Sequence, residues 1–86
     1  MQASNWDNHF TSSEYVFGVD PDPFLVAQEN RLLPGMRALS VGDGEGRNGV
    51  WMATKGLDVL SVDISSVALK KARELAWQRR VPLGVV

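Results

Sequence analysis

Apolar and polar residues follow one another in blocks whose spacing predicts alternating strands and helices. Short apolar runs favour strands, whereas apolar residues three and four positions apart favour helices. The strands are expected at 36–41, 58–63 and 83–86, and the helices at 23–33, at 47–55 and from the Ser65 cap to the Pro82 stop. Strands that alternate with helices build a parallel sheet, so residues 36–86 are predicted to form a βαβαβ core of the α/β class.

Residues 1–22 precede this core without a clean periodicity, and we expect them to form an N-terminal arm that packs on the core. Asp22 and Pro23 suit the cap and the first position of the first long helix. Trp51 and Trp77 lie beside alanines at helical spacings and are expected to be packing residues. No second domain is indicated, and residues 1–86 are expected to be part of a single domain.

The composition is that of a small globular unit, because 44% of the 86 residues are hydrophobic. The absence of cysteine excludes disulfides and thiolate metal sites, and we expect no metal centre. The first 30 residues carry five acids and no Lys or Arg, unlike a secretory or mitochondrial leader. No apolar run approaches the roughly 20 residues of a membrane span. We therefore expect a cytoplasmic protein without a membrane partner.

Charge argues against a nucleic-acid partner, since the formal net charge is −1. The cations of the C-terminal third are interpreted as a solvated helix face, where the helix dipole favours them. These cations are Lys70, Lys71, Arg73, Arg79 and Arg80. The apolar run at 83–86 would be an unprotected sheet edge, which predicts a longer domain or pairing with a second copy.

The most informative segment joins the first strand to the next helix. Gly42, Gly44 and Gly46 alternate there, and glycine lets a backbone turn sharply and come close to a ligand. A loop between a strand and a helix N-terminus is typical of nucleotide-like ligand sites. Asp63 ends the second strand 21 residues after Gly42, where such folds place the acid that binds ribose hydroxyls.

Two glycine registers compete in this loop. Gly44, Gly46 and Gly49 match the G-x-G-x-x-G pattern of dinucleotide-binding folds. Gly42, Gly44 and Gly46 match the G-x-G-x-G loop of S-adenosylmethionine (SAM) enzymes. The second register opens where the apolar strand stops and leaves free amides at the helix N-terminus, so it is favoured.

The segment from Leu32 to Ala72 resembles class I SAM-dependent methyltransferases, near the tellurite-resistance and thiopurine-methyltransferase-like group. The resemblance is carried by four collinear stretches, namely Leu33-Pro34-Gly35, Gly44-Glu45-Gly46-Arg47-Asn48, Gly56-Leu57-Asp58-Val59 and Val62-Asp63-Ile64-Ser65. It implies a Rossmann-like, three-layer αβα fold with a parallel sheet, of which this chain would be the incomplete N-terminal half.

The resemblance also implies roles for individual residues. The loop residues Gly42, Asp43, Gly44 and Gly46 would lie under the methionine part of SAM. Asp63 would accept hydrogen bonds from both ribose hydroxyls, Ile64 would pack on the adenine, and Arg47 would hold the methionine carboxylate.

The chain departs from the family pattern at one position. Many relatives carry an acid two residues before the first loop glycine, and this chain has Ser40 there. Asp43 and Glu45 are the candidate substitutes. In related methyltransferases an N-terminal arm folds over the cofactor, which makes Trp6, Tyr15 and Phe17 candidates for a lid.

The implied activity is methyl transfer from SAM to a small molecule, with a soft thiol-, selenium- or tellurium-type acceptor by family analogy. Catalytic residues of this group come mainly from later strands, so we expect the 86-residue chain alone to be inactive. Two alternatives stay open, which are an NAD-type oxidoreductase fragment and a non-catalytic binding or assembly module.

Overall fold

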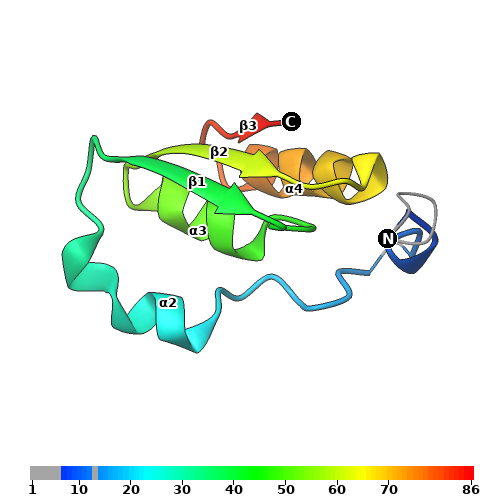
Figure 1. The fold of residues 1–86 in the computed structure, drawn as a ribbon, viewed down its shortest axis with the longest axis horizontal. Helices are drawn as coiled ribbons and strands as arrows, with labels where there is room; N and C mark the ends of the chain where they lie inside the picture. The colour runs from blue at the N-terminus through cyan, green and yellow to red at the C-terminus, as the bar shows by residue number, and fades with distance from the viewer. Residues whose placement is uncertain (1–6, 13) are drawn as a thin grey trace.

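The computed structural model describes residues 7–12 and 14–86. Within them the chain forms three strands, three α-helices of defined bounds and one 3₁₀ turn (Figure 1). In chain order these are α2 (Pro23–Ala27), η1 (Glu29–Arg31), β1 (Arg37–Val41), α3 (Arg47–Thr54), β2 (Asp58–Val62), α4 (Ser66–Gln78) and β3 (Gly84–Val85). The predicted βαβαβ order of residues 36–86 is confirmed.

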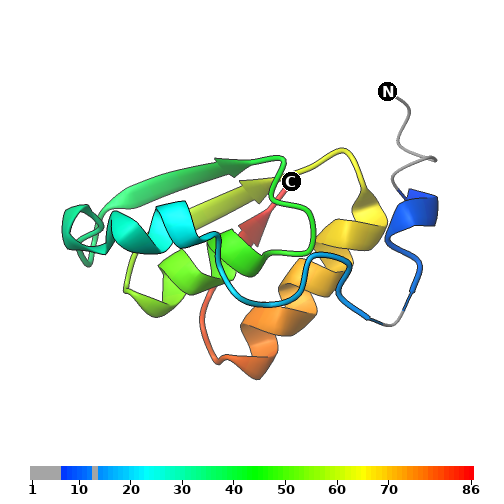
Figure 2. The same cartoon turned by 90° about the horizontal axis from the view of Figure 1, so that it is seen from below.

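The sheet is parallel throughout and has the order β1-β2-β3. Leu39 of β1 lies opposite Leu60 of β2, and Leu60 lies opposite Gly84 of β3. Figure 2 shows α2, α3 and α4 in front of the strands, so all three helices cover the same face of the sheet. The carboxyl ends of β1 and β2 therefore open at one edge, where the loops to α3 and α4 begin.

The core lies between this sheet face and the helices. Val59 and Ser61 of β2 point into it and are buried. On the opposite face Leu39, Val41 and Leu60 are 63%, 75% and 39% exposed. The described residues thus supply two of the three layers of the expected fold, the sheet and one helical layer. None of their helices is long and apolar enough to cross a membrane.

The first helix is shorter than predicted. Asp22 caps it as expected, since its carboxylate accepts from the Phe24 N–H at 2.8 Å. The helix nevertheless ends at Ala27, because the Gln28 N–H bonds to the carbonyl of Leu25, three residues back, and the chain tightens into η1. Phe24, in the first turn of this helix, is 74% exposed.

The last helix is also shorter than predicted. Its cap is Ser65, as expected, and it ends at Gln78 rather than continuing to the proline. Trp51 packs against the core as predicted, whereas the prediction for Trp77 is wrong, because its side chain is 83% exposed. The buried stripe of α4 consists of Ala68, Ala72, Leu75 and Ala76, and the residue that follows it turns towards solvent.

Candidate cofactor site

The loop between β1 and α3 takes its shape from three glycines. Gly42, Gly44 and Gly46 have φ angles of +66°, +60° and +91°, in the left-handed region that strongly favours glycine. Gly49 lies inside α3 and has no positive φ. The turning glycines of this loop are therefore those of the Gly42-x-Gly44-x-Gly46 register.

Asp63 fastens this loop to the end of β2. Its Oδ2 accepts from the Gly44 N–H at 2.9 Å, and its Oδ1 accepts from the Ser65 N–H at 2.9 Å. The hydrogen bond to the Ser65 N–H helps to turn the chain into α4, which is a structural role for Asp63. Asp63 also brings the glycine loop and the end of β2 together at one edge of the sheet.

The carboxylate of Asp43 is directed into the protein. It accepts from the Gly49 N–H at 3.1 Å and from the Ser61 hydroxyl at 2.7 Å, and the residue is buried. A Cβ at Gly49 would lie 2.4 Å from both Asp43 Oδ2 and Ser61 Oγ. Glycine at position 49 is thus required by space rather than by backbone conformation, since any side chain would displace this buried pair.

A cavity of about 570 Å³ opens beside the glycine loop and Asp63. Its volume lies in the range of small-molecule sites, and it sits outside the carboxyl ends of parallel strands, where open α/β sheets bind ligands. The lining residues are Phe10, Phe17, Val41, Gly42, Asp43, Gly44, Arg47, Asn48, Val62, Asp63 and Ile64.

Six of the seven residues that the sequence nominates for cofactor binding lie on this cavity, namely Gly42, Asp43, Gly44, Arg47, Asp63 and Ile64. Gly46 is not among the lining residues. It is the N-terminal cap of α3, and a Cβ there would lie 2.7 Å from the Cβ of Ala72. Gly46 therefore allows the loop to approach α4 rather than a ligand.

Arg47 reaches the cavity while paired to the segment that precedes α2. Its guanidinium Nη2 lies 3.8 Å from Asp22 Oδ2, and both side chains are partly exposed. The neighbouring Asn48 accepts from the Asp22 N–H at 2.8 Å through its side-chain oxygen. The start of α2 is thereby held against the start of α3.

The N-terminal arm forms one wall of the cavity. Phe10 is 2% exposed, and its ring contacts Phe17 edge-on with centroids 6.4 Å apart. Of the predicted lid residues, Phe17 lines the cavity, Tyr15 packs beside α4 instead, and Trp6 lies outside the described residues. Sequence reasoning missed Phe10, because no local motif shows where an arm without periodicity will dock.

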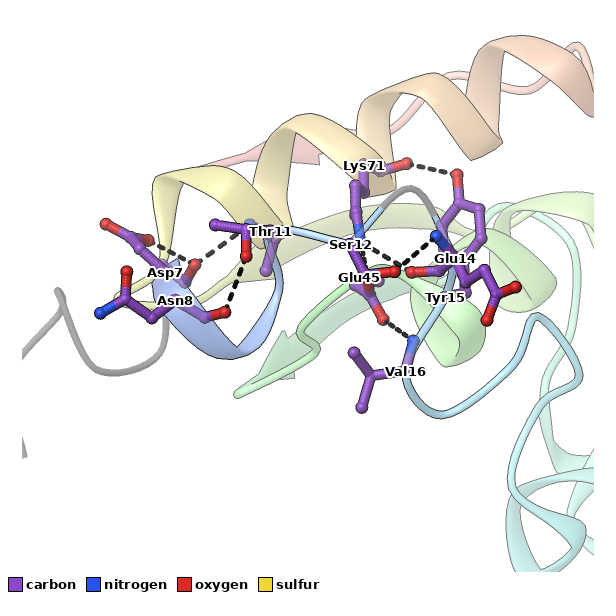
Figure 3. Close-up of polar contacts among 11 residues, drawn as sticks. Asp7, Asn8, Thr11, Ser12, Glu14, Tyr15, Val16, Glu45 and Lys71 are labelled. Carbon is purple, nitrogen blue, oxygen red and sulfur yellow. Dashed lines mark hydrogen bonds and ion pairs between the residues drawn. The ribbon is translucent and has the colours of Figure 1, made fainter.

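The two acids proposed to replace the family acid at position 40 are both engaged within the protein. Asp43 bonds to Gly49 and Ser61. Glu45 accepts from the Val16 N–H and pairs with Lys71 (Figure 3), and it is not among the residues that line the cavity. Lys71 is also not part of a solvated face as predicted, since its side chain is only 12% exposed.

The pKa of Tyr15, beside the Glu45–Lys71 pair, is clearly shifted. Burial raises the pKa of the Tyr15 phenol above its ordinary value of 10.0, and the carboxylates of Glu74 and Glu45 raise it further, while Arg79 opposes them. The neutral phenol is therefore the form that the folded chain favours.

No protein-family profile matches the sequence, and no curated protein matches it. Solved structures do match. A structure from work on the conversion of a disulfide bond into a thioacetal group during echinomycin biosynthesis shares 23% identity at a TM-score of 0.85, over 99% of this chain and 39% of its own.

Two further neighbours have the same fold over nearly all of this chain. TehB from Haemophilus influenzae shares 18% identity at a TM-score of 0.72, over 94% of this chain and 27% of its own. A SAM-dependent methyltransferase from Thiobacillus denitrificans, in complex with S-adenosylhomocysteine, shares 21% identity at a TM-score of 0.72, over 100% of this chain and 37% of its own. This chain thus spans less than two fifths of each of these three neighbours. It shares the Rossmann-like fold of part of the SAM-dependent methyltransferases, which confirms, at the level of the fold, the resemblance that its sequence indicates.

Proposed function

We propose that this chain binds SAM in the 570 Å³ cavity and forms the cofactor-binding part of a methyltransferase. The observation that carries the proposal is the glycine loop with Asp63 bonded to its Gly44 amide beside the cavity. A Geobacter sulfurreducens methyltransferase of related fold, with 20% identity and a TM-score of 0.67, was also crystallised with S-adenosylhomocysteine. This supports the choice of ligand.

The residues on the cavity suit the parts of this ligand. Each Asp63 oxygen already accepts one backbone hydrogen bond, and a carboxylate oxygen has a second lone pair for a ribose hydroxyl. Ile64 is 53% exposed and offers an apolar surface for the adenine. Gly42, where an added Cβ would have no neighbouring atom within 4 Å, leaves the loop backbone open for close approach of the methionine part. Arg47, which also lines the cavity, would hold the carboxylate.

SAM brings an electrophilic methyl group when it is bound, so the protein's work is to hold donor and acceptor in line and exclude water. The cavity residues of this chain bind and orient the donor. We propose a small-molecule acceptor, and we expect the 86-residue chain alone to bind the cofactor without turnover, since the three neighbours described above are more than twice as long.

Isothermal titration of the chain with S-adenosylhomocysteine, with NADH as the comparator, tests the proposal. The diagnostic variant is Asp63→Asn, which keeps the shape of the side chain and one acceptor oxygen. The matched control is Asp58→Asn, at the far end of the same strand, where the 78% exposed carboxylate lies 3.9 Å from Arg37.

We expect saturable binding of S-adenosylhomocysteine whose Kd rises at least about tenfold in Asp63→Asn, because hydrogen bonds to a charged group contribute about 1.5–3 kcal/mol each. The control should bind like the wild type. Tighter binding of NADH would favour the oxidoreductase alternative, and no binding of either ligand by a folded chain would refute the proposal.

The uncovered sheet face supports a second role, as an assembly module. Leu39 and Val41 are mostly exposed, and within the described residues β1 pairs only with β2. We propose that this edge and face pair with a second copy or another polypeptide. Sedimentation of the ligand-free chain should then show a dimer that Leu39→Lys dissociates, and a monomer at all concentrations would contradict self-association.

A further inference from the structure

Glu45 lies in the glycine loop, but its side chain serves the N-terminal arm. The residue is 4% exposed, and its Oε1 accepts from the Val16 N–H at 2.7 Å. Its Oε2 lies 2.6 Å from the Nζ of Lys71 on α4 (Figure 3). A loop residue thus joins the arm to a helix across the interior.

Lys71 holds the same part of the arm by two further hydrogen bonds. Its Nζ donates to the carbonyl of Glu14 at 2.8 Å, and its own backbone carbonyl accepts from the Tyr15 hydroxyl at 3.1 Å. The ammonium also lies 5.7 Å from the centroid of the Tyr15 ring. We call Glu45, Lys71 and the arm residues 14–16 that they hold the clasp.

The clasp lies next to the cavity wall that the arm provides. Phe17 follows Val16 directly, and Phe10 is held between the clasp and a second anchor. That anchor is Asp7, whose Oδ1 accepts from the Ser65 hydroxyl at 2.6 Å. Release of the clasp would remove the middle anchor of the wall, between Asp7 on its N-terminal side and the contacts of Asp22 with Arg47 and Asn48 on its C-terminal side.

Burial makes the Glu45–Lys71 ion pair important for the stability of the docked arm. An exposed pair contributes little because water screens it, whereas removal of one partner from a buried pair leaves an uncompensated charge. Glu45 and Lys71 have side chains that are 4% and 12% exposed. Loss of the Glu45 or the Lys71 charge should therefore displace the arm, because the arm lies on the surface and can move away from the clasp.

We propose that Glu45 is a positioning residue, which holds the arm over the cavity so that arm docking and cofactor binding are linked. The linkage rests on the proposed function. If the ligand binds only when the arm is docked, its apparent Kd equals the intrinsic Kd divided by the docked fraction. Occupation of the cavity must then stabilise the docked arm by the same factor.

Hydrogen exchange of the arm, followed by mass spectrometry on the 86-residue chain, tests the clasp first without ligand. The variants are Glu45→Gln, which keeps an acceptor for Val16 but loses the charge, Lys71→Met, and Lys71→Arg as the conservative variant. Glu29→Gln is the matched control, since it breaks the partly exposed Glu29–Lys55 pair, which is not part of the clasp.

Exchange at residues 10–18 should rise about tenfold or more in Glu45→Gln and Lys71→Met, within the usual range of coupling between sites. Exchange in β2 should stay as in the wild type, Lys71→Arg should restore much of the protection, and the control should change neither. An arm that stays protected in both variants, or exchange that rises equally in arm and sheet, would overturn the clasp.

Titration of the same variants with S-adenosylhomocysteine then tests the linkage. The Kd should rise by the inverse of the docked fraction measured without ligand, and saturating ligand should restore arm protection in Glu45→Gln. A released arm with an unchanged Kd would overturn the linkage. A wild-type chain that binds no S-adenosylhomocysteine would refute the proposed function and the linkage, while the ligand-free exchange would still decide the clasp.

Discussion

The contact between the glycine loop and α4 gives a quantitative prediction at Gly46. A Cβ at this position would lie 2.7 Å from the Cβ and 2.9 Å from the Cα of Ala72, distances that real Cβ atoms essentially never show. The residue also has a φ of +91°. Gly46→Ala therefore adds two separate penalties, one from backbone strain and one from overlap with a helix.

The magnitude follows from these two terms. Left-handed backbone costs a residue with a Cβ about 1–2 kcal/mol, and overpacking a close contact costs about 1–3 kcal/mol more. Gly42→Ala isolates the first term, because Gly42 has a φ of +66° and a Cβ added there would have no neighbouring atom within 4 Å. We expect losses in the free energy of unfolding of about 2–5 kcal/mol for Gly46→Ala and about 1–2 kcal/mol for Gly42→Ala.

Urea unfolding followed by far-ultraviolet circular dichroism measures both variants, with the slope against urea checked for constancy. The double variant Gly46→Ala/Ala72→Gly removes the Cβ–Cβ overlap and should be less destabilised than the sum of the single changes. If Gly46→Ala costs no more than Gly42→Ala, the loop does not approach α4 this closely, and the reasoning is refuted.

Buried contacts elsewhere in the chain give three more predictions. Tyr15 is the single tyrosine of the chain, so a titration followed by near-ultraviolet absorbance reports on its phenol alone, and its pKa should lie above 10.0. Because the pKa is raised in the folded chain, the stability that the neutral phenol adds is present below pH 10.0 and is lost as pH rises through the folded pKa. A titration midpoint at or below pH 10.0 would contradict this prediction. Gly49→Ala should lower the free energy of unfolding in urea by about 1–3 kcal/mol, because the new methyl group meets Asp43 and Ser61. This loss should exceed the gain from the better helix propensity of alanine, so a rise in stability would refute the close contact. Ser65→Ala removes the cap of α4 and a hydrogen bond to the arm, so the free energy of unfolding should fall by about 1–2 kcal/mol, and an unchanged urea midpoint would count against the cap.

The sequence by itself determined the features that depend on neighbouring residues. The three parallel strands, the caps Asp22 and Ser65, and the turning glycines of the loop after β1 are all encoded within a few positions. Periodicity, capping and the conformational freedom of glycine act over one or two turns of chain, so they can be read without knowledge of the fold. The spacing from the loop to Asp63 then placed both at one sheet edge, because parallel strands end on the same side.

Only the tertiary structure decided what the polar side chains of the site contact. Glu45 and Lys71 are 26 residues apart in sequence, and Asp7 and Ser65 are 58 apart. Side chains so far apart meet only after the helices have packed on the sheet, and no local pattern records which will meet. Packing likewise turned Lys71 from an expected surface cation into a partly buried partner of Glu45 and left Trp77 in solvent, since burial depends on which neighbours a helix face acquires.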